Sequence, residues 1–199
     1  MKKIVVLVSG GGTNLQALID AQKRGELGGG TISLVISSKP DVYALERARA
    51  NDIPTLVLSR KEYGSIAEYS RALADAMEQR EIDLVVLAGF LTILPENVIR
   101  AYDHRILNVH PSLIPSFCGD GFYGLRVHEA ALQKGVKVTG ATIHFVNEIT
   151  DGGDIIAQKA VEVLPDDTPE TLQKRVMVEA EWVLLPQAVE TVARALSVS

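Results

Sequence analysis

The sequence has little that would tie it to a membrane, an export route or a disulfide framework. It contains a single cysteine, Cys118, so no disulfide can form within the chain, and a reducing compartment is favoured. No apolar run approaches the roughly 20 residues that span a bilayer. The apolar run from Ile4 to Val8 is too short for an export signal and leads directly into a glycine loop. We therefore expect a soluble, cytoplasmic protein without a membrane partner.

Basic charge and metal-ligand patterns are also scarce. The chain has 20 Lys and Arg against 25 Asp and Glu, a formal net charge of −5, and no run of basic residues. A large nucleic-acid surface needs clustered Lys and Arg, so we expect no nucleic-acid partner. No His or Cys residues stand at the spacing of a metal-ligand set, and we expect no bound metal.

The first 110 residues alternate apolar segments of strand length with helical segments. Such alternation predicts βαβ units and a parallel sheet. The composition, 47% hydrophobic and 23% charged over 199 residues, is typical of a single globular domain. The expected strands cover residues 3–9, 31–38, 54–59, 82–90 and 105–110, and the expected helices cover 14–25, 42–52, 65–80 and 95–102.

Beyond residue 110 the pattern changes. A glycine-dense loop precedes a short helix, two long extended segments that should pair antiparallel, and a mostly helical tail. We expect Pro186 to kink that tail or to start a second helix. The prediction is an α/β fold with one domain over residues 1–199. Residues 1–110 should form a Rossmann-like, mostly parallel, phosphate-binding half. Residues 111–199 should add an antiparallel extension and a C-terminal helix, and complete the site.

The segment SGGGTN lies between the first expected strand and its helix. Such a turn presents free backbone amides and the positive end of a helix dipole, which suit a phosphate. Gly10 and Gly12 fit the start of a dinucleotide-binding pattern, but Leu15 occupies the place of its third glycine, and no P-loop lysine follows. A phosphate site is favoured. The turn could also be a tight connection in which Thr13 or Asn14 caps the helix, and both interpretations can hold together.

A second candidate site is the pair Asn108 and His110, which precedes Pro111 at the end of an expected strand. Alternate residues of a strand share a face, and a proline stops regular pairing. Open α/β sheets bind ligands at this edge. His exchanges a proton near neutral pH, and Asn can donate to an oxyanion, so the pair suits chemistry at a carbonyl carbon. The alternative is a pair of polar residues that are satisfied locally.

Asp151 precedes two glycines in an expected turn. It either makes a local turn or orients His110 and raises the pKa of that imidazole, and spacing does not choose between these roles. His144 is a second candidate acid, for which a structural role is favoured. We expect Cys118 to be a small loop residue rather than a nucleophile.

Four segments resemble one known family: VVLVSGGGTNLQALI, VVLAGFLTIL, ILNVHPSLIPSFCG and TIHFVNEITDGGDIIAQ. In this order they are similar to the phosphoribosylglycinamide formyltransferases, which are folate-dependent enzymes, and the similarity covers essentially the whole chain. The resemblance implies transfer of a formyl group from 10-formyltetrahydrofolate to the amine of glycinamide ribonucleotide in purine biosynthesis. It also implies small-molecule partners only, no metal, and a monomer or homodimer.

The resemblance assigns roles to the candidate residues. The substrate phosphate would lie on Gly12, Thr13 and Asn14, and Glu181 would bind the sugar or amine end. Asn108 would stabilise the oxyanion, His110 would be the general acid, and Asp151 would keep His110 protonated. The folate would contact Leu91, Thr92, Ile93, Leu94, Asn108, Asn147, Glu148, Ile149, Thr150 and Asp151.

Two departures from the family and two other functions remain open. Thr92 stands where many relatives carry Arg, and Met177 stands where some carry Gln or Lys, so those side-chain contacts are in doubt. One alternative function is formylation of a sugar-nucleotide amine. The other is a non-catalytic Rossmann-like nucleotide-binding protein, which would leave Asn108, His110 and Asp151 without a joint purpose.

Overall fold

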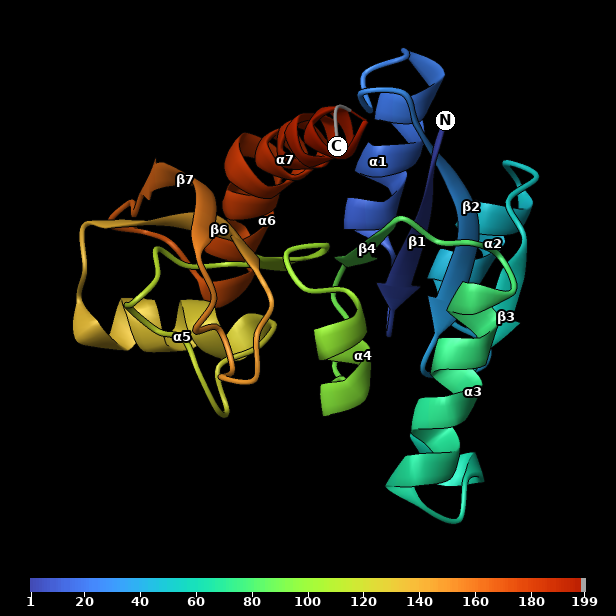
Figure 1. The fold of residues 1–199 in the computed structure, drawn as a ribbon. Helices are drawn as coiled ribbons and strands as arrows, with labels where there is room; N and C mark the ends of the chain where they lie inside the picture. Colours follow the sequence, from blue (N-terminus) through green and yellow to red (C-terminus); the bar gives the residue numbers. More distant parts are fainter. Residues whose placement is uncertain (198–199) are drawn as a thin grey trace.

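The computed structural model describes residues 1–197, so the last two residues of the predicted 111–199 half lie outside it. A seven-stranded sheet forms its centre, in the order β3-β2-β1-β4-β5-β6-β7 (Figure 1). The first five strands are parallel, and β6 and β7 continue the sheet antiparallel, so the predicted fold class is confirmed. The strands are β1 (Lys2–Val8), β2 (Gly30–Ser37), β3 (Thr55–Val57), β4 (Leu84–Leu87), β5 (Ile106–His110), β6 (Val138–Phe145) and β7 (Ile155–Glu162).

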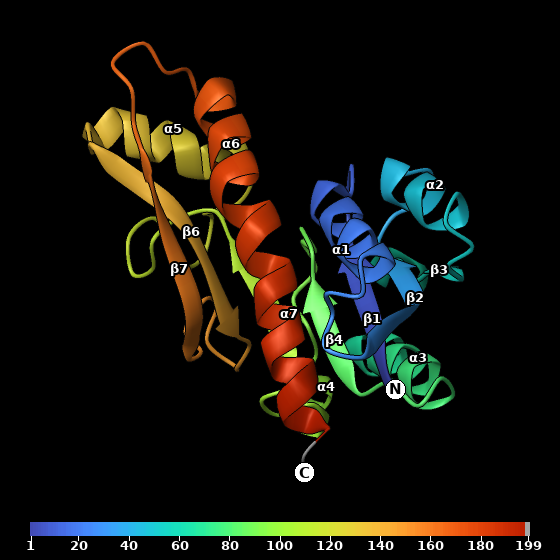
Figure 2. The same cartoon turned by 90° about the horizontal axis from the view of Figure 1, so that it is seen from above.

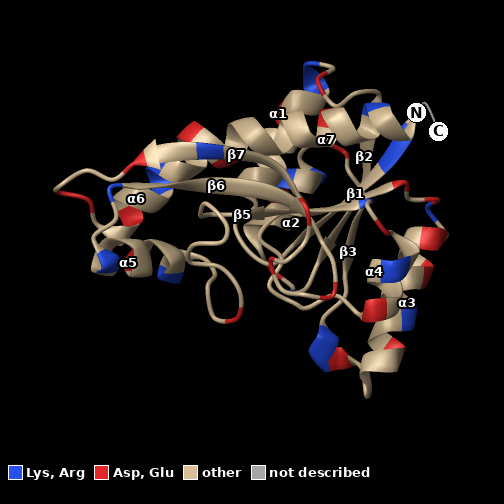
Figure 3. Ribbon diagram, turned by 60° about the vertical axis from the view of Figure 1, so that its left-hand side comes forward, with Lys and Arg blue, Asp and Glu red and all other residues tan. Residues whose placement is uncertain are grey.

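Helices cover the sheet. The last two helices, α6 and α7, form one long rod that lies against the antiparallel strands β6 and β7 (Figure 2). Lys and Arg positions are intermixed with Asp and Glu along the helices in Figure 3. The helices are α1 (Thr13–Lys23), α2 (Tyr43–Arg49), the 3₁₀-helix η1 (Arg60–Glu62), α3 (Ile66–Glu78), α4 (Glu96–Ala101), α5 (Leu125–Lys134), α6 (Pro169–Val176), the π-helix η2 (Met177–Glu181) and α7 (Trp182–Leu196).

Strand β1 is apolar almost throughout because both of its faces are buried. Ile4, Val6 and Val8 face one core cluster, which α1 and α7 complete. Val5 and Leu7 face the opposite cluster with α3 and α4. A parallel strand covered on both faces needs apolar side chains at consecutive positions rather than at alternate ones. The sheet is therefore the middle layer of a three-layer arrangement (Figure 1).

The strand order determines where a ligand can bind. From β1 the chain builds outward through β2 and β3, then returns to the other side of β1 to form β4 and β5. Ligands of open α/β sheets lie at such a switch point, beyond the carboxyl ends of the strands. The carboxyl ends of β1, β4 and β5 therefore lie together, and β5 ends at His110, beside Pro111, as expected.

The helical tail differs from the prediction. Pro186 does not start a second helix, because it lies inside α7. The irregularity is the π-helix η2, which ends at Glu181, just before the turn that contains the proline. A proline lacks the amide that an α-helical turn uses, and an inserted π turn is one way in which a helix accommodates such a defect.

Within residues 1–197 no helix is both long and apolar enough to cross a bilayer. The same residues contain no group of three or more His, Cys, Asp and Glu side chains that could hold a metal ion.

Asp167 and Arg175 form an ion pair that should stabilise the fold at neutral pH. Both carboxylate oxygens of Asp167 lie 2.6 Å from the guanidinium, and the pair, mainly through this hydrogen bonding, lowers the pKa of Asp167 to about 2. A carboxyl with a lowered folded pKa stabilises the fold above its unfolded pKa and loses that contribution as the pH falls through the folded value. Asp167→Asn should lower the Tm at pH 7 by about 5 °C, and the difference from wild type should shrink between pH 4 and pH 2.

Thermal unfolding of the variant and of wild type from pH 7 to pH 2 measures this difference in Tm. Asp166→Asn, at an exposed neighbour, is the control, and an equal loss in both variants would contradict the prediction.

Candidate active site

A pocket of about 830 Å³ opens at the shared edge of β1, β4 and β5. Its lining includes all residues that the sequence nominated for catalysis, substrate binding and folate binding. The lining segments are residues 10–14, 87–94, 108–111, 119–124 and 146–151, with Glu96, Ile99, His144, Gln173, Met177 and Glu181.

Asn108 and His144 meet because β5 and β6 are antiparallel neighbours that place them directly opposite each other. His144 Nδ1 donates to the Phe145 carbonyl oxygen at 2.8 Å, so this nitrogen carries a hydrogen. Nε2 then accepts a hydrogen bond from Asn108 Nδ2 at 3.1 Å. His144 is buried and therefore orients the Asn108 amide, which agrees with the structural role favoured for it.

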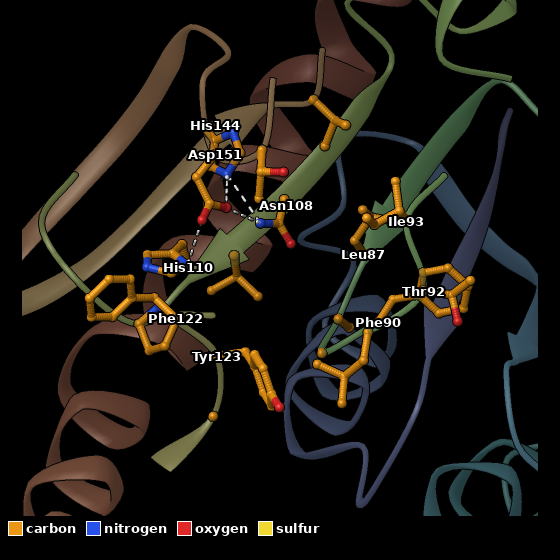
Figure 4. A pocket seen from close by; sticks show the side chains of 18 of the residues that line it. Leu87, Phe90, Thr92, Ile93, Asn108, His110, Phe122, Tyr123, His144 and Asp151 are labelled. Atoms are coloured by element: carbon orange, nitrogen blue, oxygen red, sulfur yellow. Dashed lines mark hydrogen bonds and ion pairs between the residues drawn. The ribbon is translucent and has the colours of Figure 1, made fainter. Parts of the chain in front are cut away.

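His110 lies on the same strand face, and its two ring nitrogens have different partners. Nε2 donates to the Phe117 carbonyl oxygen at 2.8 Å, and Nδ1 lies 3.5 Å from Asp151 Oδ2 (Figure 4). Burial lowers the pKa of His110 below its ordinary value, while the Asp151 charge and the Phe117 carbonyl offset part of that decrease. The sequence predicted a raised pKa. The contribution of Asp151 has the predicted sign, but desolvation outweighs it.

Asp151 links these groups from the loop between β6 and β7. It adopts a φ of 54°, in the left-handed region that Asp tolerates within turns. Oδ2 accepts the Gly119 amide at 2.9 Å, and Oδ1 lies 3.5 Å from both His144 Nε2 and Asn108 Nδ2. Burial alone would raise the pKa of Asp151, but the adjacent His144 ring, the hydrogen bond from the Gly119 amide and the positive charge of protonated His110 hold it below its ordinary value. Asp151 is therefore ionised at neutral pH.

At the other end of the pocket the glycine loop leads from β1 into α1. Gly12, at a φ of 72°, is the N-cap of α1, and no side chain caps the helix, so the predicted cap by Thr13 or Asn14 is wrong. Asn14 Nδ2 instead donates to Glu181 Oε2 at 2.7 Å. Asn14 Oδ1 is buried and has no hydrogen-bond partner within the described chain, which makes it an acceptor open to a ligand.

Glu181 is a buried carboxyl group at the end of the π-helix η2. Burial raises the pKa of Glu181 to about 7, although the hydrogen bond from Asn14 partly opposes this. Gln173 and Met177 precede it at intervals of four residues, the spacing that places helical side chains on one face. All three line the pocket. The sequence reasoning missed Gln173, which this spacing could have identified.

The wall opposite the catalytic cluster is apolar. Leu91 and Ile93 are large side chains that stay mostly exposed, as expected at a ligand surface. Phe122 and Tyr123 face the pocket from the loop that follows Pro111, whereas Phe90, Thr92 and Ile93 lie across from them (Figure 4). The sequence reasoning did not nominate Phe122 or Tyr123. The available signal was an aromatic pair within a glycine-dense loop.

The opposing effects on His110 can be separated by mutation. In Asp151→Asn the pKa of His110 should fall further, because the charge that opposes burial is removed. An NMR titration of the imidazole measures this pKa. Asp120→Asn is the control, since Asp120 lines the same pocket but makes no hydrogen bond or ion pair with His110 in residues 1–197. An unchanged or higher His110 pKa in Asp151→Asn would contradict this account.

Comparison with known proteins agrees with the resemblance seen in the sequence. Residues 2–189 match the formyl transferase family. Over 179 residues the chain is 43% identical to phosphoribosylglycinamide formyltransferase, chloroplastic, of Arabidopsis thaliana, covering 89% of this chain but only 61% of that relative. It is 40% identical to phosphoribosylglycinamide formyltransferase of Haemophilus influenzae, covering 96% of this chain and 86% of the relative.

A solved structure shows the same architecture. The crystal structure of glycinamide ribonucleotide transformylase 1 from Symbiobacterium toebii superimposes with a TM-score of 0.91 at 41% identity, covering 98% of this chain and 89% of that one. The family match spans most of the sequence, and the similar structure covers almost all of both chains. The chain therefore belongs to the formyl transferase family, and within it resembles the phosphoribosylglycinamide formyltransferases.

Proposed function

We propose that this chain transfers the formyl group of 10-formyltetrahydrofolate to the amine of glycinamide ribonucleotide. The observation that carries the proposal is the 3.5 Å approach of His110 Nδ1 to Asp151 Oδ2, inside the pocket that the glycine loop also lines. A non-catalytic nucleotide-binding protein has no need of a buried imidazole–carboxylate pair beside its ligand. The names of the relatives supply the acceptor and the transferred formyl group, and the family resemblance in the sequence supplies the folate donor.

The substrates have distinct places along the pocket. The phosphate lies against the backbone amides of Gly12, Thr13 and Asn14, where the α1 dipole favours negative charge. The sugar or amine end reaches Glu181 and the open acceptor Asn14 Oδ1. The folate lies between residues 91–94 and residues 147–151, and its formyl group lies beside Asn108 and His110.

Transfer then proceeds through a tetrahedral intermediate. The amine nitrogen forms a bond to the formyl carbon, and the carbonyl oxygen becomes negatively charged. Asn108 Nδ2 has two partners, His144 Nε2 at 3.1 Å and Asp151 Oδ1 at 3.5 Å, and it exchanges the longer of these two hydrogen bonds for one to that oxygen. The bond between the carbon and N10 breaks, and N10 takes a proton from His110. The proton that the attacking amine loses passes to Asp151 through water.

The ring nitrogens of His110 divide this work. Nδ1 faces Asp151, whose negative charge stabilises the imidazolium, so Nε2 carries the proton that is transferred. In the structure Nε2 donates to the Phe117 carbonyl oxygen, so this hydrogen bond has to break before Nε2 can reach N10. Both halves of the predicted domain contribute to the site, because His110 ends the first half and Asp151 belongs to the second. This supports residues 1–199 acting as one unit.

Mutation of His110 tests the assignment. His110→Ala should lower kcat/KM at least ~100-fold, since one acid or oxyanion donor typically contributes that much. The measurement is release of tetrahydrofolate from 10-formyltetrahydrofolate, with glycinamide ribonucleotide, with a sugar-nucleotide amine, and with no amine. The exposed His104 supplies the control variant His104→Ala. Equal activity of His110→Ala and wild type would remove the acid role, and turnover without an amine would make the enzyme a hydrolase.

The raised pKa of Glu181 predicts a pH-dependent KM. Substrate hydrogen-bond donors bind the ionised carboxylate better, so the KM for glycinamide ribonucleotide should rise as the pH falls below about 7. In Glu181→Gln this component of the KM profile should be absent, while the titration of the substrate itself remains in both proteins. Parallel KM profiles from pH 5.5 to 8.5 in the two proteins would contradict a role for the Glu181 charge.

A further inference from the structure

Helix α2 lies outside the pocket but contacts the back of the glycine loop. We propose that Arg47 of α2 is a positioning residue that turns the Gly11 and Gly12 amides toward the phosphate of the substrate. The inference rests on the proposed function, because it concerns the phosphorylated acceptor.

Two backbone carbonyls of the loop are held from the side of α2. The Ala44 amide donates to the Gly10 carbonyl oxygen at 3.2 Å. Arg47 Nε donates to the Gly11 carbonyl oxygen at 2.9 Å. Both oxygens therefore point at α2 and away from the pocket.

The direction of these two carbonyl groups also determines the direction of the following amides. In a planar trans peptide the carbonyl of one residue and the N–H of the next point in opposite directions. Because the Gly10 and Gly11 carbonyls point at α2, the N–H groups of Gly11 and Gly12 point away from it. Both glycines line the pocket, and neither amide donates a hydrogen bond within the described chain. Successive amides aimed at one space form an anion-binding concavity.

The Arg47 side chain is itself fixed, as a positioning residue must be. Its Nη1 donates to Gln16 Oε1 at 3.1 Å, and its guanidinium carbon lies 4.8 Å from the centre of the Tyr43 ring. The helix packs so closely on the loop that a Cβ at Gly12 would lie 2.6 Å from the Ala44 Cβ. Gly12 also has a φ of 72°, so both the backbone conformation and the contact with Ala44 exclude a side chain there. The shape of the loop thus depends on α2.

Charge supplies a second reason for this arrangement. The pocket lining contains five Asp and Glu side chains, two of which pair with Arg100 from outside it, and among the described residues it contains no Lys or Arg. A phosphate entering this space meets a negative field, which the backbone amides must overcome. Arg47 places a positive charge in hydrogen-bond contact with the loop, on the side that the ligand does not occupy. A cation in that position favours anion binding without a direct bond to the phosphate.

Variants of Arg47 test the inference against matched controls. The measurements are the KM for glycinamide ribonucleotide, the KM for 10-formyltetrahydrofolate, the Kd of ribose 5-phosphate by calorimetry, and the Tm. In Arg47→Ala the first KM and the ribose 5-phosphate Kd should rise about 10–50-fold, the range of one hydrogen bond to a charged group. The folate KM should change less than ~3-fold, because the hydrogen bonds of the Arg47 side chain go to Gly11 and Gln16 rather than to residues 91–94 or 147–151.

Two further variants separate geometry from charge and from helix stability. Arg47→Lys keeps the charge but not the planar donor, so it should recover only part of the affinity. Arg49→Ala removes an exposed arginine of the same helix that pairs with Glu46, and it should leave both constants unchanged. Full recovery in Arg47→Lys would overturn the positioning role.

The remaining outcomes also decide the question. An equal rise of both KM values with a lower Tm would show that Arg47 only holds the fold, and would overturn the inference. If wild type binds ribose 5-phosphate and Arg47→Ala binds it equally well, the inference fails while the proposed function stands. If wild type neither binds this probe nor uses glycinamide ribonucleotide, the proposed function fails, and the inference fails with it.

Discussion

The carboxylate of Asp151 is the interaction on which the catalytic end of the pocket depends. Its two oxygens divide the cluster, one serving His110 and the Gly119 amide and the other serving His144 and Asn108. A buried charge is tolerated only when such partners surround it, and in a medium of low polarity each partner is in turn held more firmly. The arrangement therefore orients a donor amide and an acid imidazole through one ionised group. Without that charge, a protonated His110 would lose its counter-ion inside a buried site.

Burial and charge act on the pKa values of His128 and His110 in different proportions. His128 is fully buried, both of its ring nitrogens lack partners within the described chain, and desolvation lowers its pKa to about 4. A histidine in that environment stays neutral and cannot act as an acid near neutral pH. His110 experiences the same desolvation, but the Asp151 carboxylate and the Phe117 carbonyl oppose it. An acid catalyst is most effective when its pKa lies near the working pH, so the value of Asp151 lies in limiting the effect of burial rather than in raising the pKa outright.

The sequence predicted those features that depend on local pattern. Apolar runs identified the strands because a doubly covered parallel strand excludes polar residues, and a period of two placed Asn108 and His110 on one face. The partners of that pair were harder to predict. The approach of Asp151 depends on the path of the loop after β6, and the pairing of His144 with Asn108 depends on register between strands that lie 36 residues apart. The π-helix before Pro186 was also missed, because proline signals a defect in a helix but not the turn that absorbs it.

The two ends of the pocket are joined by more than their common sheet. The Leu91 amide, at the folate wall, donates to Ser9 Oγ at 2.9 Å, and Ser9 immediately precedes the glycine loop. Ser9 Oγ also shares a 2.6 Å hydrogen bond with Ser38 Oγ, and both serines are buried. The wall that receives the donor and the loop that receives the acceptor phosphate are thus fixed to the same point at the end of β1. A two-substrate transfer gains most from a constant distance between its reactants, because that distance sets how often the amine and the formyl carbon meet in reacting geometry. The adjacency of β1 and β4 sets this distance, and Ser9 keeps the loops from altering it independently.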